Sequence, residues 1–155
     1  MLLPSFPHKK QRHESDCLVA CVEMVLAYLL VPTTYDQIAK RLRTQWFGTP
    51  FGNIIYMESL GLRITLAYQG TIETFEQAIN IGLPVIVNVK TIDWDHWQGE
   101  ETYHAVVVVG IDHGTGIIYI HDPFFAESPI ALSLHKFLNA WEEQERQYAI
   151  IGLTP

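Results

Sequence analysis

The spacing of apolar residues changes along the chain, and the change divides it into a helical part and a strand-rich part. Up to about residue 81 most apolar positions recur at helical spacing, whereas from residue 84 they form β-branched runs of strand length. The pattern predicts helices over residues 17–30, 34–42, 52–60, 72–81 and 133–143, and strands over residues 62–68, 84–90, 104–112, 116–122 and 148–153. Helices followed by an antiparallel sheet indicate an α+β fold.

The helix predicted over residues 17–30 is apolar on nearly every face. At 100° per residue Cys17, Cys21, Met24 and Tyr28 share one face, and the remaining faces are apolar as well. Such a helix is typically buried and central. Ser15 or Asp16 is the expected N-cap, which places Cys17 in the first turn.

Short polar signals separate the other elements. Thr34 followed by Gln37 predicts a capping box, and Thr71 is the expected cap of the helix over residues 72–81. The turn at residues 113–116 predicts that the two strands beside it form a hairpin.

Composition narrows the class of protein. The chain has 155 residues, which fits one domain over residues 1–155, and it is 48% hydrophobic and 17% charged, which excludes intrinsic disorder. The net charge of −7 argues against nucleic-acid binding. Residues 91–155 hold two basic and ten acidic side chains, so the negative charge is concentrated there.

The apolar stretch over residues 18–31 follows several basic residues and superficially copies a signal peptide. Glu23 interrupts it, no small-x-small cleavage site follows, and its 14 residues are fewer than the roughly 20 needed to span a bilayer. We therefore expect a cytoplasmic protein with no membrane span of its own. Two cysteines exclude a disulfide framework, and their i, i+4 spacing on one helix is a poor geometry for a bridge.

Cys17 is the first candidate for chemistry. Unpaired N–H groups and the positive end of the helix dipole stabilise a thiolate at a helix N-terminus. A nucleophilic thiol also needs a base within hydrogen-bond reach. Cys21, one turn further along, is expected to be a packing residue.

Among the seven histidines, His104 has the most suggestive position. It opens a strand of apolar residues directly after a long loop, so a rigid backbone would present its side chain to a cleft. Asp122 ends the paired strand at the same end of the hairpin and is the expected orienting acid, although an Asx turn before Pro123 is an alternative reading. The Cys17 N–H and the Gln11 side-chain amide are candidate oxyanion donors.

The pattern Gln11-x-x-x-x-Asp16-Cys17, followed by His104 on a valine-rich strand and Asp122-Pro123, resembles the C39 family of papain-like cysteine peptidases. The resemblance covers nearly the whole chain and implies a papain-like fold, with a buried N-terminal helix packed against an antiparallel sheet. It implies that Cys17 is the nucleophile, His104 the base and acid, Asp122 its orienting residue and Gln11 the oxyanion-hole donor.

The same resemblance implies a peptide or protein substrate, no cofactor and no metal, and it suggests association with a transporter or another partner protein. Family members usually have glycine after the nucleophile, whereas this chain has Leu18, which is expected to crowd the cleft or alter the substrate.

Several alternatives stay open. Acyl transfer to an amine would use the same residues as hydrolysis. A catalytically silent C39-like domain would bind a peptide or leader segment in the cleft. Metal binding by Cys17 and Cys21 lacks a recognisable set of partner ligands. Finally, the acidic, Trp-bearing loop over residues 91–103 either walls the cleft, favouring a basic or extended peptide, or is a solvated loop whose Trp residues pack on the domain.

Overall fold

Helices cover both faces of a six-stranded antiparallel sheet in the computed structural model, which describes residues 1–155. The elements are α1 Cys17–Tyr28, α2 Tyr35–Arg41, the 3₁₀ helix η1 Phe51–Leu60, β1 Leu62–Ala67, α3 Ile72–Asn80, β2 Val85–Lys90, the 3₁₀ turn η2 Asp95–Trp97, β3 Tyr103–Asp112, β4 Ile117–His121, β5 Ile130–Ser133, α4 Leu134–Glu142 and β6 Tyr148–Leu153. The strand order is β1-β6-β2-β3-β4-β5. The predicted α+β class is confirmed.

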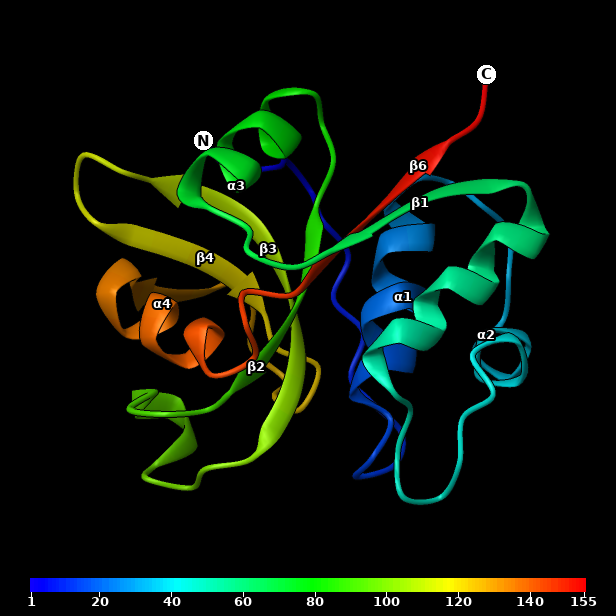
Figure 1. Cartoon of the computed structure of the whole chain (residues 1–155), viewed down its shortest axis with the longest axis horizontal. Coiled ribbons are helices and arrows are strands. Elements are labelled where there is room, and N and C mark those ends of the chain that lie inside the picture. Colours follow the sequence, from blue (N-terminus) through cyan, green and yellow to red (C-terminus); the bar gives the residue numbers. More distant parts are fainter.

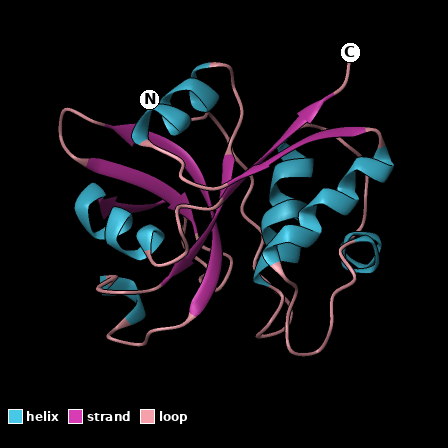
Figure 2. Cartoon of the chain, in the orientation of Figure 1, coloured by secondary structure: helices cyan, strands magenta, loops and turns pink.

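The helices form two groups separated by the sheet (Figure 1, Figure 2). Helix α1 packs against β3, and α2 and η1 lie on the same side as α1. Helices α3 and α4 pack together on the other side, where the ring of Phe75 lies 4.7 Å from that of Trp141. Strand β3 is therefore buried on both faces, which explains its uninterrupted run of valines.

Helix α1 is the buried central helix that its apolar faces predict. Eight of its 12 residues are buried, and it ends at Tyr28, two residues earlier than predicted. The Asp16 N-cap makes no side-chain capping bond. Its buried carboxylate instead accepts a hydrogen bond of 2.6 Å from the Tyr35 hydroxyl, which anchors the start of α1 to α2.

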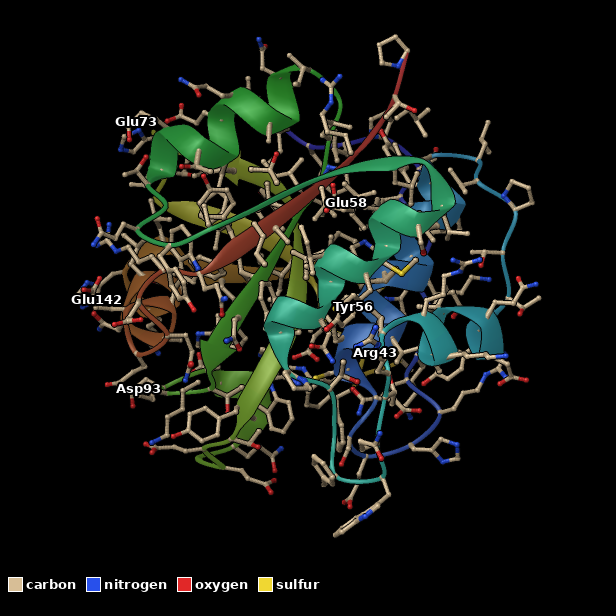
Figure 3. The ribbon with its side chains drawn as sticks, turned by 45° about the vertical axis from the view of Figure 1, so that its right-hand side comes forward. Arg43, Tyr56, Glu58, Glu73, Asp93 and Glu142 are labelled. Carbon is tan, nitrogen blue, oxygen red and sulfur yellow. The ribbon has the colours of Figure 1, made fainter.

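The segment predicted as a helix over residues 52–60 is helical, but it has the 3₁₀ form. Phe51, Ile54 and Met57 recur every third residue and all three are buried. A period of three matches the 3₁₀ helix, whose side chains at i and i+3 eclipse one another. The Arg43 guanidinium lies 3.8 Å from the centre of the Tyr56 ring and ties the end of α2 to η1 (Figure 3).

The capping boxes predicted at Thr34 and Thr71 are both formed. The predicted strands are confirmed to within two residues, whereas β5 and η2 were not predicted. No helix has both the length and the hydropathy needed to cross a bilayer.

The hairpin of β3 and β4 positions the two polar candidates of the sheet. Val107 pairs with His121, so Asp122 lies just beyond the paired end of β4, while His104 lies three residues before Val107 on β3. Both therefore come to the end of the hairpin that is distant from the turn. The N-terminal end of α1 and the start of β3 lie at the same end of the molecule (Figure 1).

Candidate active site

Cys17 is the first residue of α1 and carries a partly buried, free thiol. The first N–H groups of a helix lack intrahelical partners and carry partial positive charge, which favours an anionic sulfur there. Cys21, also free, is completely buried one turn further on. The structure therefore separates the two thiols as the sequence predicts.

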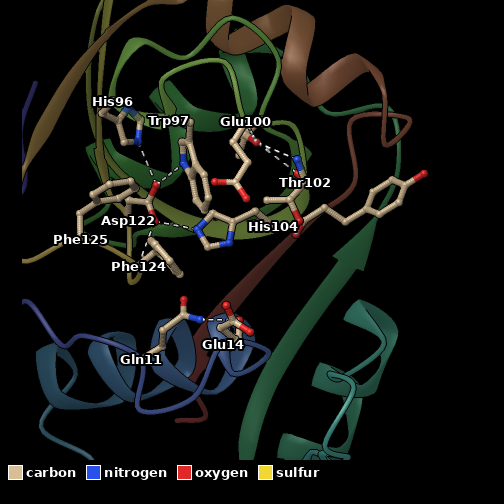
Figure 4. Close-up of polar contacts among 12 residues, drawn as sticks. Gln11, Glu14, His96, Trp97, Glu100, Thr102, His104, Asp122, Phe124 and Phe125 are labelled. Atoms are coloured by element: carbon tan, nitrogen blue, oxygen red, sulfur yellow. Dashed lines mark hydrogen bonds and ion pairs between the residues drawn. The ribbon is translucent and has the colours of Figure 1, made fainter.

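His104 links the thiol to Asp122. Its Nε2 hydrogen-bonds to Asp122 Oδ1 at 2.6 Å, and both side chains are buried (Figure 4). His104 and the Cys17 thiol line the same cleft, close enough for each to shift the pKa of the other. Because Nε2 is engaged with Asp122, Nδ1 is the ring nitrogen left to exchange a proton with Cys17.

Cys17 and His104 shift each other's pKa. Burial raises the pKa of Cys17, but the hydrogen bond and charge of His104, with the N–H groups of Ala105 and Leu18, bring it below its ordinary value. Burial lowers the pKa of His104, but the Asp122 carboxylate and the Cys17 sulfur outweigh it and raise the pKa to about 9. The arrangement therefore favours a thiolate–imidazolium pair.

Asp122 is held by four donors and is fully buried. Oδ1 accepts from His104 and from the Phe124 N–H at 3.1 Å, and Oδ2 accepts from His96 Nε2 at 2.9 Å and Trp97 Nε1 at 3.0 Å. Burial raises the pKa of Asp122, but the charge and hydrogen bond of His104 and the bond from His96 lower it well below the usual range. The Asp122 carboxylate therefore stays ionised near neutral pH and holds a negative charge against Nε2 of the His104 imidazole.

Sequence reasoning did not identify His96 and Trp97 as partners of Asp122. Both lie on η2, a short turn within the loop over residues 91–103. One sequence feature could have indicated this role. It is the Asp-His-Trp triplet at residues 95–97, which lies in an otherwise aperiodic loop shortly before the strand of His104.

Aromatic rings enclose the buried carboxylate and imidazole. The Trp97 ring lies 5.0 Å from the His104 ring in an edge contact, and also packs on Phe124 and Phe125. The His96 ring stacks on Trp94. These apolar contacts keep water from the bond between His104 and Asp122 and so strengthen it.

Gln11 occupies a different setting from the one that an oxyanion donor needs. Its Nε2 donates to the backbone carbonyls of His13 at 2.9 Å and Glu14 at 2.7 Å, and its Oε1 is buried without a partner. Its own backbone N–H donates to the Pro123 carbonyl and brings it close to the Asp122 segment. Both protons of the Gln11 side-chain amide are therefore already used in hydrogen bonds to backbone carbonyls.

A cleft of about 510 Å³ opens over Cys17 and His104. Leu18 also lines it, although this side chain is only 3% exposed. From the loop over residues 91–103, Trp97 and Glu100 reach the cleft, while Trp94 packs into the core. The loop therefore does both things that the sequence suggested as alternatives: part of it walls the cleft, and one of its Trp residues packs on the domain. No group of three or more His, Cys, Asp or Glu side chains is arranged to hold a metal ion.

Comparisons with known proteins concern the family and the fold of the chain. A model of the Peptidase_C39 like family matches residues 4–149. No curated protein sequence matches the chain.

Three solved structures share the fold. A Bacillus anthracis protein assigned as a C39-like peptidase is 18% identical with a TM-score of 0.77, over 99% of this chain and 97% of that one. The peptidase domain of Streptococcus ComA, a bi-functional ABC transporter of a quorum-sensing pathway, is 19% identical with a TM-score of 0.76, over 96% and 99%. A double glycine motif protease from an AMS/PCAT transporter, solved with its leader peptide, is 20% identical with a TM-score of 0.70, over 96% and 91%.

Proposed function

This chain belongs to the Peptidase_C39 like family, and on that premise we propose that it is a cysteine peptidase that hydrolyses peptide bonds through a thioester acyl-enzyme. The observation that best supports the proposal is the hydrogen bond between His104 and Asp122, with the Cys17 thiol beside His104 on the same cleft. The lowered pKa of Cys17 and the raised pKa of His104 are what a nucleophile and its proton carrier require.

In the proposed reaction the Cys17 sulfur attacks the carbonyl carbon of the substrate, forming an S–C bond and an oxyanion. When the C=O double bond re-forms, the C–N bond breaks and His104 gives its proton to the leaving amine. His104 then takes a proton from a water molecule whose oxygen attacks the thioester, and the thiolate leaves. Asp122 keeps the imidazole oriented and stabilises its charged form throughout.

The proposed oxyanion donors are the Cys17 N–H and the Gln11 amide. The Cys17 N–H belongs to the first turn of α1 and has no intrahelical partner. For Gln11 to take part, Nε2 must release the carbonyl of His13 or Glu14 when the substrate binds.

That engagement of Gln11, together with Leu18 after the nucleophile, favours one second candidate. A catalytically silent C39-like domain would bind a peptide or leader segment in the same cleft without turnover. Its binding would survive Cys17→Ala, and no peptide would be cleaved by the wild-type protein. Acyl transfer to an amine would instead give an amide product in place of the free acid.

Alkylation by iodoacetamide tests the proposal directly. In a Cys21→Ala background the rate is measured across pH for the parent, for His104→Ala and for the exposed control His135→Ala. Cys17 should alkylate well below the ordinary thiol pKa of about 8.5, His104→Ala should move the profile to higher pH, and His135→Ala should leave it unchanged. A parent profile like that of a free thiol contradicts the proposal.

Three finer expectations remain predictions of the sequence: a cytoplasmic location, association with a transporter or other partner protein, and one domain over residues 1–155. The last is supported by a single core cluster of 40 buried residues that includes both α1 and the sheet.

A further inference from the structure

The charged side chains that line the cleft point to the kind of substrate it takes, an inference that rests on the proposed function. Besides His104, the charged residues of the lining are Glu14 and Glu100, and no lysine or arginine is among them. Neither glutamate takes part in an ion pair. Glu14 comes from the segment before α1 and Glu100 from the loop before β3, so they approach His104 from opposite sides (Figure 4).

Exposed aromatic side chains accompany these carboxylates. Phe47, Tyr103 and Phe124 line the cleft and are 62%, 70% and 37% exposed. Phe47 follows α2, whereas Tyr103 and Phe124 flank His104 and Asp122, so the rings come from both the helical part and the sheet part of the chain. The Tyr103 ring already has a cation of this chain near it, because the Lys90 ammonium lies 5.7 Å from its centre. No lysine or arginine of the chain lies over the ring of Phe47 or Phe124.

Carboxylates and exposed aromatic rings that line the same cleft are complementary to one kind of side chain. A cation is attracted both to a carboxylate and to the face of an aromatic ring, and the methylene stem of lysine or arginine packs along the ring. The surplus of acidic residues in 91–155 adds a long-range attraction of the same sign. We propose that the cleft selects polypeptides that carry lysine or arginine close to the bond attacked by Cys17.

Peptide binding to the Cys17→Ala protein tests this selection without requiring turnover. The probes are blocked octapeptides of glycine and serine with one Arg, Gln or Glu, placed at each position in turn, and calorimetry measures their affinity. At the best position the Arg peptide should bind on the order of tenfold tighter than the Glu peptide, and salt should weaken the preference. The double change Glu14→Gln and Glu100→Gln should remove most of it.

A matched control removes the same net charge elsewhere. Glu58 on η1 and Glu143 after α4 are exposed and do not line the cleft (Figure 3 labels Glu58). Their double change to Gln should preserve the preference. The inference is overturned if both double variants lose the preference for Arg equally. It is also overturned if the Arg and Glu peptides bind equally well, or if no peptide binds.

A second measurement uses the thiol itself, in Cys21→Ala protein. Cationic and anionic methanethiosulfonate reagents modify Cys17, and the ratio of their rates should fall several-fold in the Glu14 and Glu100 double variant only. An unchanged ratio overturns the inference. These outcomes leave the proposed function intact, because the iodoacetamide profile with His104→Ala decides that separately.

Discussion

Asp122→Asn removes a buried charge while preserving the volume of the side chain. The carboxylate has two acceptor oxygens, one facing His104 and the Phe124 N–H and the other facing His96 and Trp97. The asparagine amide has only one acceptor oxygen, so one of these two pairs of donors must face its NH₂ group. In one orientation the Trp97 N–H loses its acceptor, and in the other the Phe124 N–H does. An unsatisfied buried N–H costs about 1–3 kcal/mol.

The larger part of the effect comes from the charge of His104. A pKa raised from 6.5 to about 9 corresponds to about 3 kcal/mol of stabilisation of the imidazolium in the folded protein. Because the Cys17 sulfur contributes to that rise, the share that Asp122 supplies is smaller. Together the two effects predict that Asp122→Asn destabilises the fold by about 3–5 kcal/mol.

The pH dependence gives the prediction its signature. The raised pKa of His104 contributes stability that is fully present below pH 6.5 and is lost as pH rises toward about 9. The lowered pKa of Asp122 contributes stability that is present above the ordinary carboxyl pKa of about 3.9 and is lost in acid. The cost of Asp122→Asn should therefore be largest between about pH 4 and 6.5 and should shrink, by up to about 1.4 kcal/mol per pH unit, on the alkaline side.

Urea unfolding followed by tryptophan fluorescence measures this cost. The comparison is made in Cys17→Ala protein, because proton release by the Cys17 thiol would otherwise offset proton uptake by His104. The reasoning is refuted if the difference in unfolding free energy between the two variants stays constant from about pH 5 to pH 9.

Three further predictions concern single side chains near the site. Trp97→Phe removes one hydrogen bond to the Asp122 carboxylate and should lower the unfolding free energy in urea by about 1.5–3 kcal/mol; an unchanged midpoint would show that the bond contributes nothing. Tyr35→Phe leaves the buried Asp16 carboxylate without this donor and should cost about 1–3 kcal/mol, whereas a neutral result in the same assay contradicts the anchoring role. Leu18→Ala removes a side chain that is 3% exposed, so it should cost about 2–5 kcal/mol without raising kcat/KM; a higher kcat/KM would mean that Leu18 obstructs the substrate.

Local patterns predicted the secondary structure well because most elements carry their own signals. The capping boxes at Thr34 and Thr71 depend on residues three apart and are formed as predicted. Strand β5 was missed because it has only four residues and takes its form from pairing with β4, which no local pattern within those four residues indicates. The 3₁₀ form of η1 was missed although the period of three in Phe51, Ile54 and Met57 is visible in the sequence.

The positions of the proposed nucleophile and of its proposed acid–base partner could be anticipated because each lies at the end of a regular element. Cys17 begins α1 and His104 begins the valine-rich part of β3, so periodicity alone places their backbones. Their meeting is a tertiary contact between elements that are far apart in the chain, and only the packing of α1 against β3 brings it about.

The surroundings of Asp122 show where sequence reasoning stops. His96 and Trp97 lie in an aperiodic loop, where neither period nor capping indicates the direction of a side chain. They point at Asp122 because a fully buried carboxylate requires donors, and the fold positions these two. Gln11 is the converse, since its place in the motif is clear but its amide protons are taken by neighbouring carbonyls. Sequence patterns therefore specified the elements and the residues at their ends, whereas hydrogen-bond partners and cleft walls depend on contacts between distant segments that only the folded chain creates.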